Sequence, residues 1–100
     1  MVSELSLITE VDGEISLKGE LTFATVPTAL REAPPLFVGQ GELRVDLSKV
    51  RRLDSAGLAL LMEWLRFANG QQRNIYFLNP PPQLERLARI SGVSELLPIV

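Results

Sequence analysis

The chain lacks two residue types that carry much of protein chemistry. Its 100 residues include no cysteine and no histidine. These absences exclude disulfides, thiol nucleophiles, thiolate zinc sites and every imidazole base or metal ligand. A metal site made of carboxylates alone remains an option, but no cluster of Asp and Glu in the sequence suggests one. We therefore predict no metal and no cofactor.

Long apolar runs and a strong excess of one charge are missing as well. The longest apolar run is Leu58–Met62, far short of the roughly 20 residues that a membrane-spanning helix needs. The first ten residues lack the basic start and apolar centre of a signal peptide. The net charge is −2 with both signs interspersed, which argues against nucleic acid as a partner. We expect a soluble, cytoplasmic protein that does not insert into a membrane.

The residues that are present fit one small domain. Apolar residues make up 46% of the chain, which suits a packed core and excludes general disorder. A chain of 100 residues has room for a single core. No linker, repeat or low-complexity segment is visible, so we predict one domain over residues 1–100.

Hydrophobic periodicity predicts strands that alternate with helices. Residues 4–10 and 14–18 are expected to form two strands of a hairpin, because Asp12-Gly13 is a strong signal for a tight turn. The further expected elements are a helix from 24–26 to 33, a strand at 42–47, a polar connection at 48–53, a helix from 55 to 69 with Gly70 as its C′ residue, a strand at 73–79, a helix from 81 to 90 and a helical turn at 94–97. We predict an α/β fold with a small mixed sheet of four to five strands, parallel crossovers and three to four covering helices.

The start of the helix expected at 55–69 carries the strongest local signal. Asp54 and Ser55 stand directly before an apolar stretch too long for a strand. Their side-chain oxygens can accept hydrogen bonds from the first free amides of a helix, so we interpret Ser55 as the N-cap and Asp54 as a second cap candidate. Gly57 lies inside the helix, where glycine costs up to about 1 kcal/mol relative to alanine. We expect another backbone to approach closely there, either a neighbouring strand or a partner.

This helix is apolar on two sides. The stripe expected to face the sheet consists of Leu58, Leu61, Met62 and Leu65. A second stripe, formed by Leu60, Trp64 and Phe67, is displaced around the helix. Two alternatives remain open for it. Another helix of the domain covers it, or it is exposed and borders one partner-binding surface together with Ser55 and Gly57.

The central stretch also resembles a known family. Its run V-D-L-S-K-V-R-R-L-D-S-A-G-L is similar to the signature of STAS domains, the fold of bacterial anti-sigma factor antagonists and sulfate-transporter tails. A narrower group, the MlaB-like STAS subunits of the ABC system that moves phospholipid between Gram-negative membranes, resembles the continuation L-A-L-L-M-E-W-L-R-F-A and the segment F-L-N-P-P-P-Q-L-E-R-L-A-R-I-S-G-V-S-E-L-L. The resemblance covers nearly the whole chain.

The resemblance implies a protein-binding function. The first expectation is a non-catalytic subunit that binds and regulates or stabilises the cytoplasmic ATPase subunit of this transporter, alongside its permease and lipid-binding subunits. Such a subunit would lie at the inner membrane through its partner. The alternative is an anti-sigma factor antagonist, a phosphorylatable switch that binds an anti-sigma factor kinase. When isolated, the domain is also a candidate homodimer.

The resemblance further makes Ser55 a candidate phosphoacceptor, because antagonists carry the phosphorylated serine or threonine at this place of the motif. We predict no catalytic residues, since Ser55 has no histidine to activate it and neither Lys18 nor Lys49 is near it in sequence. The candidate partner-binding residues are Asp54, Ser55, Ala56, Gly57, Leu60 and Trp64.

Overall fold

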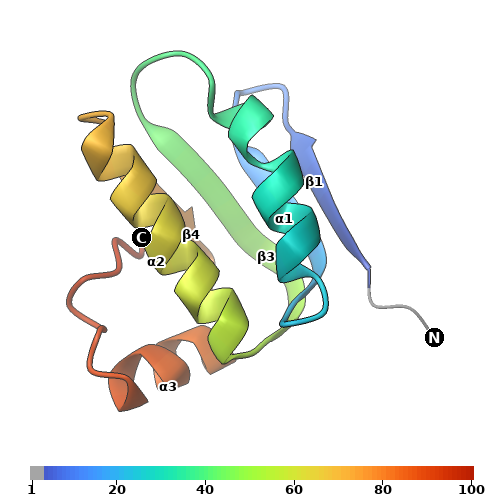
Figure 1. The fold of residues 1–100 in the computed structure, drawn as a ribbon, viewed down its shortest axis with the longest axis vertical. Helices are drawn as coiled ribbons and strands as arrows, with labels where there is room; N and C mark the ends of the chain where they lie inside the picture. The colour runs from blue at the N-terminus through green and yellow to red at the C-terminus, as the bar shows by residue number, and fades with distance from the viewer. Residues whose placement is uncertain (1–3) are drawn as a thin grey trace.

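The computed structural model describes residues 4–100, so residues 1–3, at the start of the stretch inspected for a signal peptide, lie outside it. The elements are β1 (Leu5–Thr9), β2 (Ile15–Leu21), α1 (Val26–Glu32), the 3-10 helix η1 (Pro34–Phe37), β3 (Leu43–Leu53), α2 (Ser55–Gly70), β4 (Ile75–Leu78) and α3 (Pro82–Ile90). Figure 1 shows their arrangement. Within residues 4–100, no helix has both the length and the apolar character to cross a membrane.

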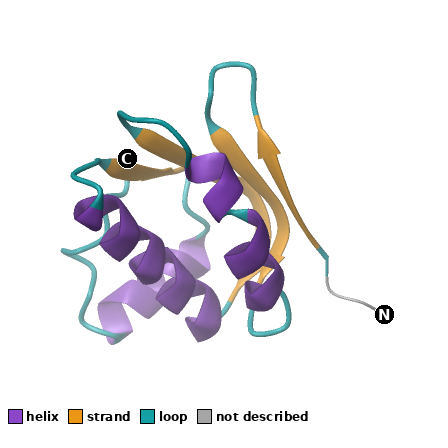
Figure 2. Ribbon diagram, turned by 45° about the horizontal axis from the view of Figure 1, so that its top comes forward, coloured by secondary structure: helices purple, strands orange, loops and turns teal. Residues whose placement is uncertain are grey.

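The four strands form one mixed sheet in the order β1-β2-β3-β4. β1 and β2 pair antiparallel through the expected hairpin, whose Gly13 has a φ of 87°. The β2–β3 and β3–β4 pairs are parallel, with α1 and α2 as their crossovers. Both helices lie side by side on the same face of the sheet, and α3 lies beyond its end (Figures 1 and 2). The predicted α/β architecture, with a hairpin followed by parallel crossovers, is confirmed.

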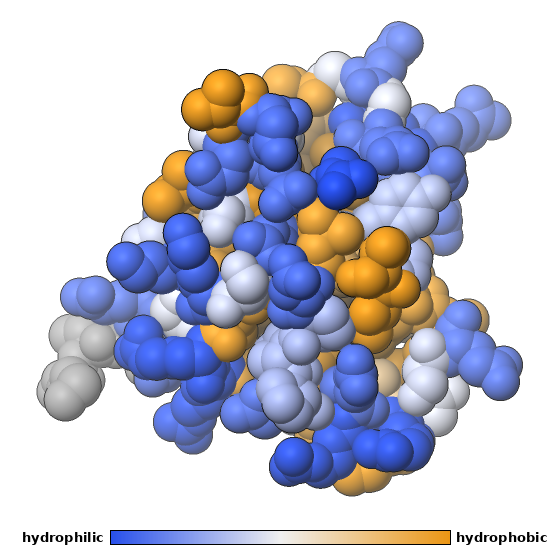
Figure 3. Space-filling model, turned by 180° about the vertical axis from the view of Figure 1, so that it is seen from behind, coloured by the Kyte–Doolittle hydropathy of each residue, from blue (hydrophilic) through white to orange (hydrophobic). Residues whose placement is uncertain are grey.

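The core lies between the helices and one face of the sheet. Alternate residues of β2 and β3 point to this side, and Leu17, Val45 and Leu47 are at most 1% exposed. Their neighbours in sequence, such as Lys18 and Arg44, are exposed on the opposite face. Seen from behind, the molecule is mainly hydrophilic with scattered apolar groups (Figure 3). The strands therefore follow the pattern of a sheet with one buried face.

Residues 48–53 form the second half of β3, not the polar connection expected from sequence. Two register shifts between β2 and β3 mark bulges, each of which adds one residue to β3. Leu47, Val50 and Leu53 are buried at a spacing of three. Since a regular strand alternates every two residues, this spacing conceals the strand in the sequence.

The C-terminal end of α2 also differs from the prediction. Gly70 belongs to the helix, and Gln72 is the residue with left-handed backbone, at a φ of 56°. The N–H of Gln72 donates to the carbonyl of Asn69 and that of Arg73 to the carbonyl of Ala68, which is the bond pair of a Schellman motif. Gln72 is thus the C′ residue, and the prediction of Gly70 there is wrong.

The motif directs Arg73 inward, where its guanidinium donates hydrogen bonds to the carbonyls of Gly41 and Phe37 at 2.9 and 2.6 Å. β4 accordingly begins only at Ile75. The helix expected from 81 begins at Pro82, and residues 94–97 form turns rather than a helix.

Candidate functional site

Asp54 caps the N-terminus of α2. Its backbone is extended (φ −112°, ψ −172°), and its Oδ1 accepts hydrogen bonds from the amides of Ala56 at 2.9 Å and Gly57 at 3.1 Å. Its Oδ2 accepts a third bond, at 3.1 Å, from the amide of Phe23 in the loop before α1. The cap is therefore Asp54, and the interpretation of Ser55 as the N-cap is wrong.

Ser55 is instead the first residue of α2, and it is exposed. Its hydroxyl makes no hydrogen bond to any residue in the range 4–100. The positive end of a helix dipole lies beside it, partly offset by the Asp54 carboxylate. A free hydroxyl on a rigid, capped helix end can be reached by a partner.

Gly57 is buried by a close approach between backbones. A Cβ at this position would lie 2.2 Å from the carbonyl oxygen of Leu21, the last residue of β2. The same oxygen accepts a hydrogen bond of 3.3 Å from the amide of Asp54. The approaching backbone is thus a strand of this domain, as one of the two alternatives had it. Gly57 does not lie on the surface, which corrects its assignment to an exposed partner-binding surface.

Leu60 and Trp64 are also buried, with exposures of 3% and 4%. The ring of Trp64 packs edge-on against Phe37 of η1, with ring centroids 5.3 Å apart. Phe67, the third member of the stripe, is 40% exposed and lies 5.8 Å from Phe37 by ring centroids. The covered alternative therefore holds for Leu60 and Trp64, with η1 among the covering elements, and their expected exposure beside Ser55 is wrong.

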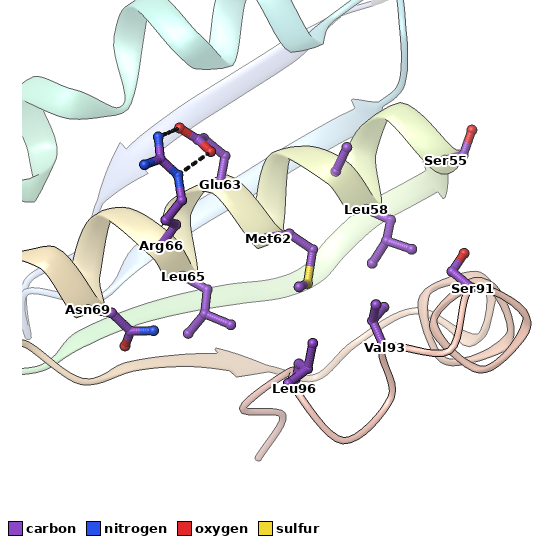
Figure 4. Close-up of a pocket in the computed structure, with 11 residues that line it drawn as sticks. Ser55, Leu58, Met62, Glu63, Leu65, Arg66, Asn69, Ser91, Val93 and Leu96 are labelled. Carbon is purple, nitrogen blue, oxygen red and sulfur yellow. Dashed lines mark hydrogen bonds and ion pairs between the residues drawn. The ribbon is translucent and has the colours of Figure 1, made fainter.

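The stripe predicted to face the sheet divides into two parts, since Leu58 and Leu61 are buried as predicted, at 5% and 0% exposure, and the rest of the stripe forms an accessible apolar side of α2. Met62 and Leu65 are only partly buried, and they face Val93 and Leu96 of the C-terminal segment (Figure 4). These side chains line a groove of about 670 Å³ that begins at Ser55. An ion pair between Glu63 and Arg66 lies on its rim. α2 presents both Ser55 and this groove because the sheet and η1 cover its other sides.

Phe23 is the residue of this site that sequence reasoning missed. α1 begins at Val26, within the predicted range for its start, and Phe23 is 81% exposed in the loop before it. The loop is fixed by Thr25, whose hydroxyl donates to the carbonyl of Glu20 at 2.8 Å. Pro27 in the first turn of α1 was the sequence signal that placed Phe23 outside the helix. Its bond to Asp54, 31 residues away, had no such signal.

Asp46 of the V-D-L-S run links two strands on the uncovered face of the sheet. Its carboxylate accepts hydrogen bonds from the amide and hydroxyl of Ser48 at 3.0 and 2.9 Å and from the side chain of Asn79, after β4, at 3.0 Å. Partial burial alone would raise the pKa of Asp46, but these bonds and the nearby charge of Lys49 lower it below the ordinary value of 3.8. This part of the motif serves the architecture of the sheet.

Similarity to known proteins extends over nearly the whole chain. The family model described as "Mlab, STAS domain" matches residues 7–98. The anti-sigma-B factor antagonist of Staphylococcus epidermidis is 32% identical over 85 residues, 84% of this chain and 79% of that protein. The protein of the same name from Staphylococcus aureus is 31% identical over the same shares. The solved structure of the anti-sigma factor antagonist SpoIIAA in its unphosphorylated form matches with a TM-score of 0.69 and 18% identity, over 97% of this chain and 88% of that chain.

Proposed function

Because the chain belongs to the STAS-domain family, we propose that it is a non-catalytic regulatory protein that binds another protein through the exposed N-terminal end of α2. The observation that carries the proposal is Ser55, whose free hydroxyl stands at the accessible start of a helix fixed by Asp54. Such a position suits both contact with a partner and modification by one.

We place the binding at the "Ser55 surface", formed by Phe23, Asp54, Ser55 and Ala56. Phe23 is 81% exposed, and exposed aromatic side chains often dominate the energy of protein interfaces. Its loop is held to the helix end by the bond between the Phe23 amide and Asp54. The surface therefore combines a polar, modifiable point with an apolar anchor. The groove along α2 extends it.

As the partner we favour an anti-sigma factor kinase, which makes the protein an anti-sigma factor antagonist with Ser55 as its phosphoacceptor. Curated relatives that are 31% and 32% identical bear the name of anti-sigma-B factor antagonists. For this reason we favour the antagonist, which was the alternative in the sequence analysis, over the transporter subunit. The protein would act in the cytoplasm.

The test is phosphorylation by the anti-sigma factor kinase encoded in the same genome. We expect the purified protein, kinase and ATP to give one phosphate per chain, located on Ser55 by mass spectrometry. Ser55→Ala should accept none, and Ser91→Ala, which changes another exposed serine of the groove, should accept as much as the wild type. If the wild type neither accepts phosphate nor forms a stable complex with the kinase, the proposal that it is an antagonist is refuted.

Contacts at the Ser55 surface are tested separately from phosphorylation. We expect Ser55→Arg, Ser55→Asp and Phe23→Ala to weaken the complex with the kinase while the melting temperature stays near that of the wild type, because both residues are exposed. Normal binding by all three variants would move the interface away from this end of α2.

The second candidate partner is the ATPase subunit of a phospholipid-transport ABC complex. The supporting observation is the family model described as "Mlab", which matches residues 7–98. Here the protein would lie at the inner membrane through its partner, with a permease and a lipid-binding subunit in the assembly. Pull-down with the purified ATPase subunit distinguishes the two candidates, since a complex with the ATPase and none with the kinase selects the transporter.

A further inference from the structure

The two edge strands of the sheet, β1 and β4, have different neighbours. At β4, residues 98–100 pair with the edge at Phe77, which donates its N–H to the carbonyl of Pro98 and accepts a hydrogen bond from the N–H of Val100 at 2.9 and 3.0 Å. Ile99 forms a parallel bridge with Phe77. At β1 no element drawn from residues 4–100 lies beyond the strand (Figures 1 and 2). Of the two edge strands, β1 is thus the one along whose outer edge no other segment of residues 4–100 pairs.

Backbone hydrogen bonds identify the groups that face this edge. The carbonyl of Glu4 accepts from the N–H of Glu20, and the N–H of Glu10 donates to the carbonyl of Glu14. Antiparallel pairs alternate along a strand, so the even-numbered residues of β1 direct their backbone groups to β2. The residues that direct N–H and C=O groups to the open edge are Leu5, Leu7 and Thr9.

β1 lacks the features that usually protect an edge strand from further pairing. Its sequence L-S-L-I-T contains no lysine, proline or glycine, and its register with β2 is unbroken by a bulge. Ile8 is 49% exposed on the uncovered face. The charges nearest in sequence are Glu4 before the strand and Glu10 after it. This edge is thus a continuous template with an acidic group at each end.

We propose that the β1 edge binds an extended segment of a protein partner as an additional strand, and that this segment carries apolar residues in alternation with lysine or arginine at both ends. Main-chain pairing provides the template, and Glu4 and Glu10 select the basic flanks, because opposite charges across strands stabilise and like charges destabilise. This surface is separate from the Ser55 surface and does not depend on the proposed function.

The same charges disfavour a second copy of this chain as the occupant. In an antiparallel pair of β1 strands centred on Leu7, Glu4 of each copy would face Glu10 of the other. Both ends of the pairing would then carry like charges directly opposite each other. No lysine or arginine precedes Lys18 in the sequence to offset them.

The first test uses two synthetic peptides of alternating valine and threonine, one with lysine at both ends and one with glutamate. Hydrogen exchange of single amides is followed by NMR. We expect the lysine peptide to slow exchange several-fold at Leu5, Leu7 and Thr9 and to leave Ile8 unchanged, since its amide already bonds to β2. The glutamate peptide should bind about tenfold more weakly.

Two proline variants distinguish loss of peptide binding at the β1 edge from loss of stability of the fold. Thr9→Pro removes an N–H that faces the open edge, so it should abolish peptide-dependent protection while the melting temperature changes little. Ile8→Pro removes an N–H directed to β2 and should lower the melting temperature. If Thr9→Pro does not fold, the double variant Glu4→Lys, Glu10→Lys keeps the proposal testable, because it should reverse the preference between the two peptides.

Three outcomes would overturn the proposal. In the first, neither peptide changes the exchange of Leu5, Leu7 and Thr9. In the second, both peptides bind equally, which removes the role of Glu4 and Glu10. In the third, these amides become protected without peptide as the protein concentration rises, and sedimentation shows a dimer, which would make a second copy the occupant.

Discussion

At the scale of single residues, Asp54 joins two segments that lie 31 residues apart. Its side chain accepts hydrogen bonds from the amides of Ala56, Gly57 and Phe23. We expect Asp54→Ala to lower the free energy of unfolding by about 2 kcal/mol, because a cap and a loop anchor are lost together. Urea denaturation measures the loss. Ser55→Ala is the matched control and should stay within about 0.5 kcal/mol. Equal losses in both variants would return the cap to Ser55.

Gly57 gives a second prediction at this scale. Its missing Cβ would lie 2.2 Å from the Leu21 carbonyl, a backbone group that cannot move without β2. We expect Gly57→Ala to destabilise the domain by about 1–3 kcal/mol, the usual range for overpacking a tight contact. The measurement is chemical denaturation monitored by Trp64 fluorescence. A neutral result would mean that α2 and β2 separate easily.

At the scale of elements, the end of α2 offers a substitution of opposite sign. Gly70 has no atom within 4 Å of an ideal Cβ and is not in the left-handed region. Gly70→Ala should therefore stabilise the protein by up to about 1 kcal/mol, because alanine favours a helix and restricts the unfolded chain. An increase in melting temperature is the expected observation. A decrease in melting temperature would indicate that Gly70 is the C′ residue, as the sequence analysis predicted.

The link between β3 and β4 predicts a pH dependence. The bonds from Asn79 and Ser48 lower the pKa of Asp46. The stability that this carboxylate contributes is therefore present above its ordinary pKa of 3.8 and is lost as pH falls through the lowered folded value. Asn79→Ala should move the pKa of Asp46 upward in an NMR titration. Asn74→Ala, an exposed asparagine before β4, should leave it unchanged.

The order and type of the four strands and of α1, α2 and α3 could be predicted from sequence, because each has its own local signal, whereas η1 was not predicted. The hairpin has Asp12-Gly13, and α2 has a cap residue before its apolar run. The second half of β3 could not be predicted, since the bulges place Val50 and Leu53 at a spacing of three in place of the strand period of two. A period identifies one face of an element only while that element stays regular.

The site was predictable only in part, for a related reason. Asp54 and Ser55 were found because a helix start has a composition of its own. Which apolar side chains of α2 remain accessible depends on where η1 packs, and the sequence has no local signal for the contact of Phe37 with Trp64. Phe23 joins the site through a bond to Asp54 that only the tertiary fold creates.

At the scale of the whole molecule, Trp64 is a large buried side chain on which the stability of the core depends. It is 4% exposed and packs edge-on against Phe37. We expect Trp64→Ala to cost about 3–5 kcal/mol in the isolated domain, a large share of the roughly 5–15 kcal/mol that stabilises a domain. Phe67→Ala, at 40% exposure, should cost less. An unchanged urea midpoint together with lost partner binding would assign Trp64 to an interface.

The backbone bonds between Phe77 and the C-terminal residues have a consequence for self-assembly. A sheet with two free edges can add copies of itself head to tail, which produces a filament of unlimited length. Here residues 98–100 already pair with β4 at Phe77, so the β1 strand of a neighbouring copy cannot pair along the whole of that edge. We therefore expect residues 98–100 to hinder the head-to-tail addition of further copies through β4, while the β1 edge stays accessible.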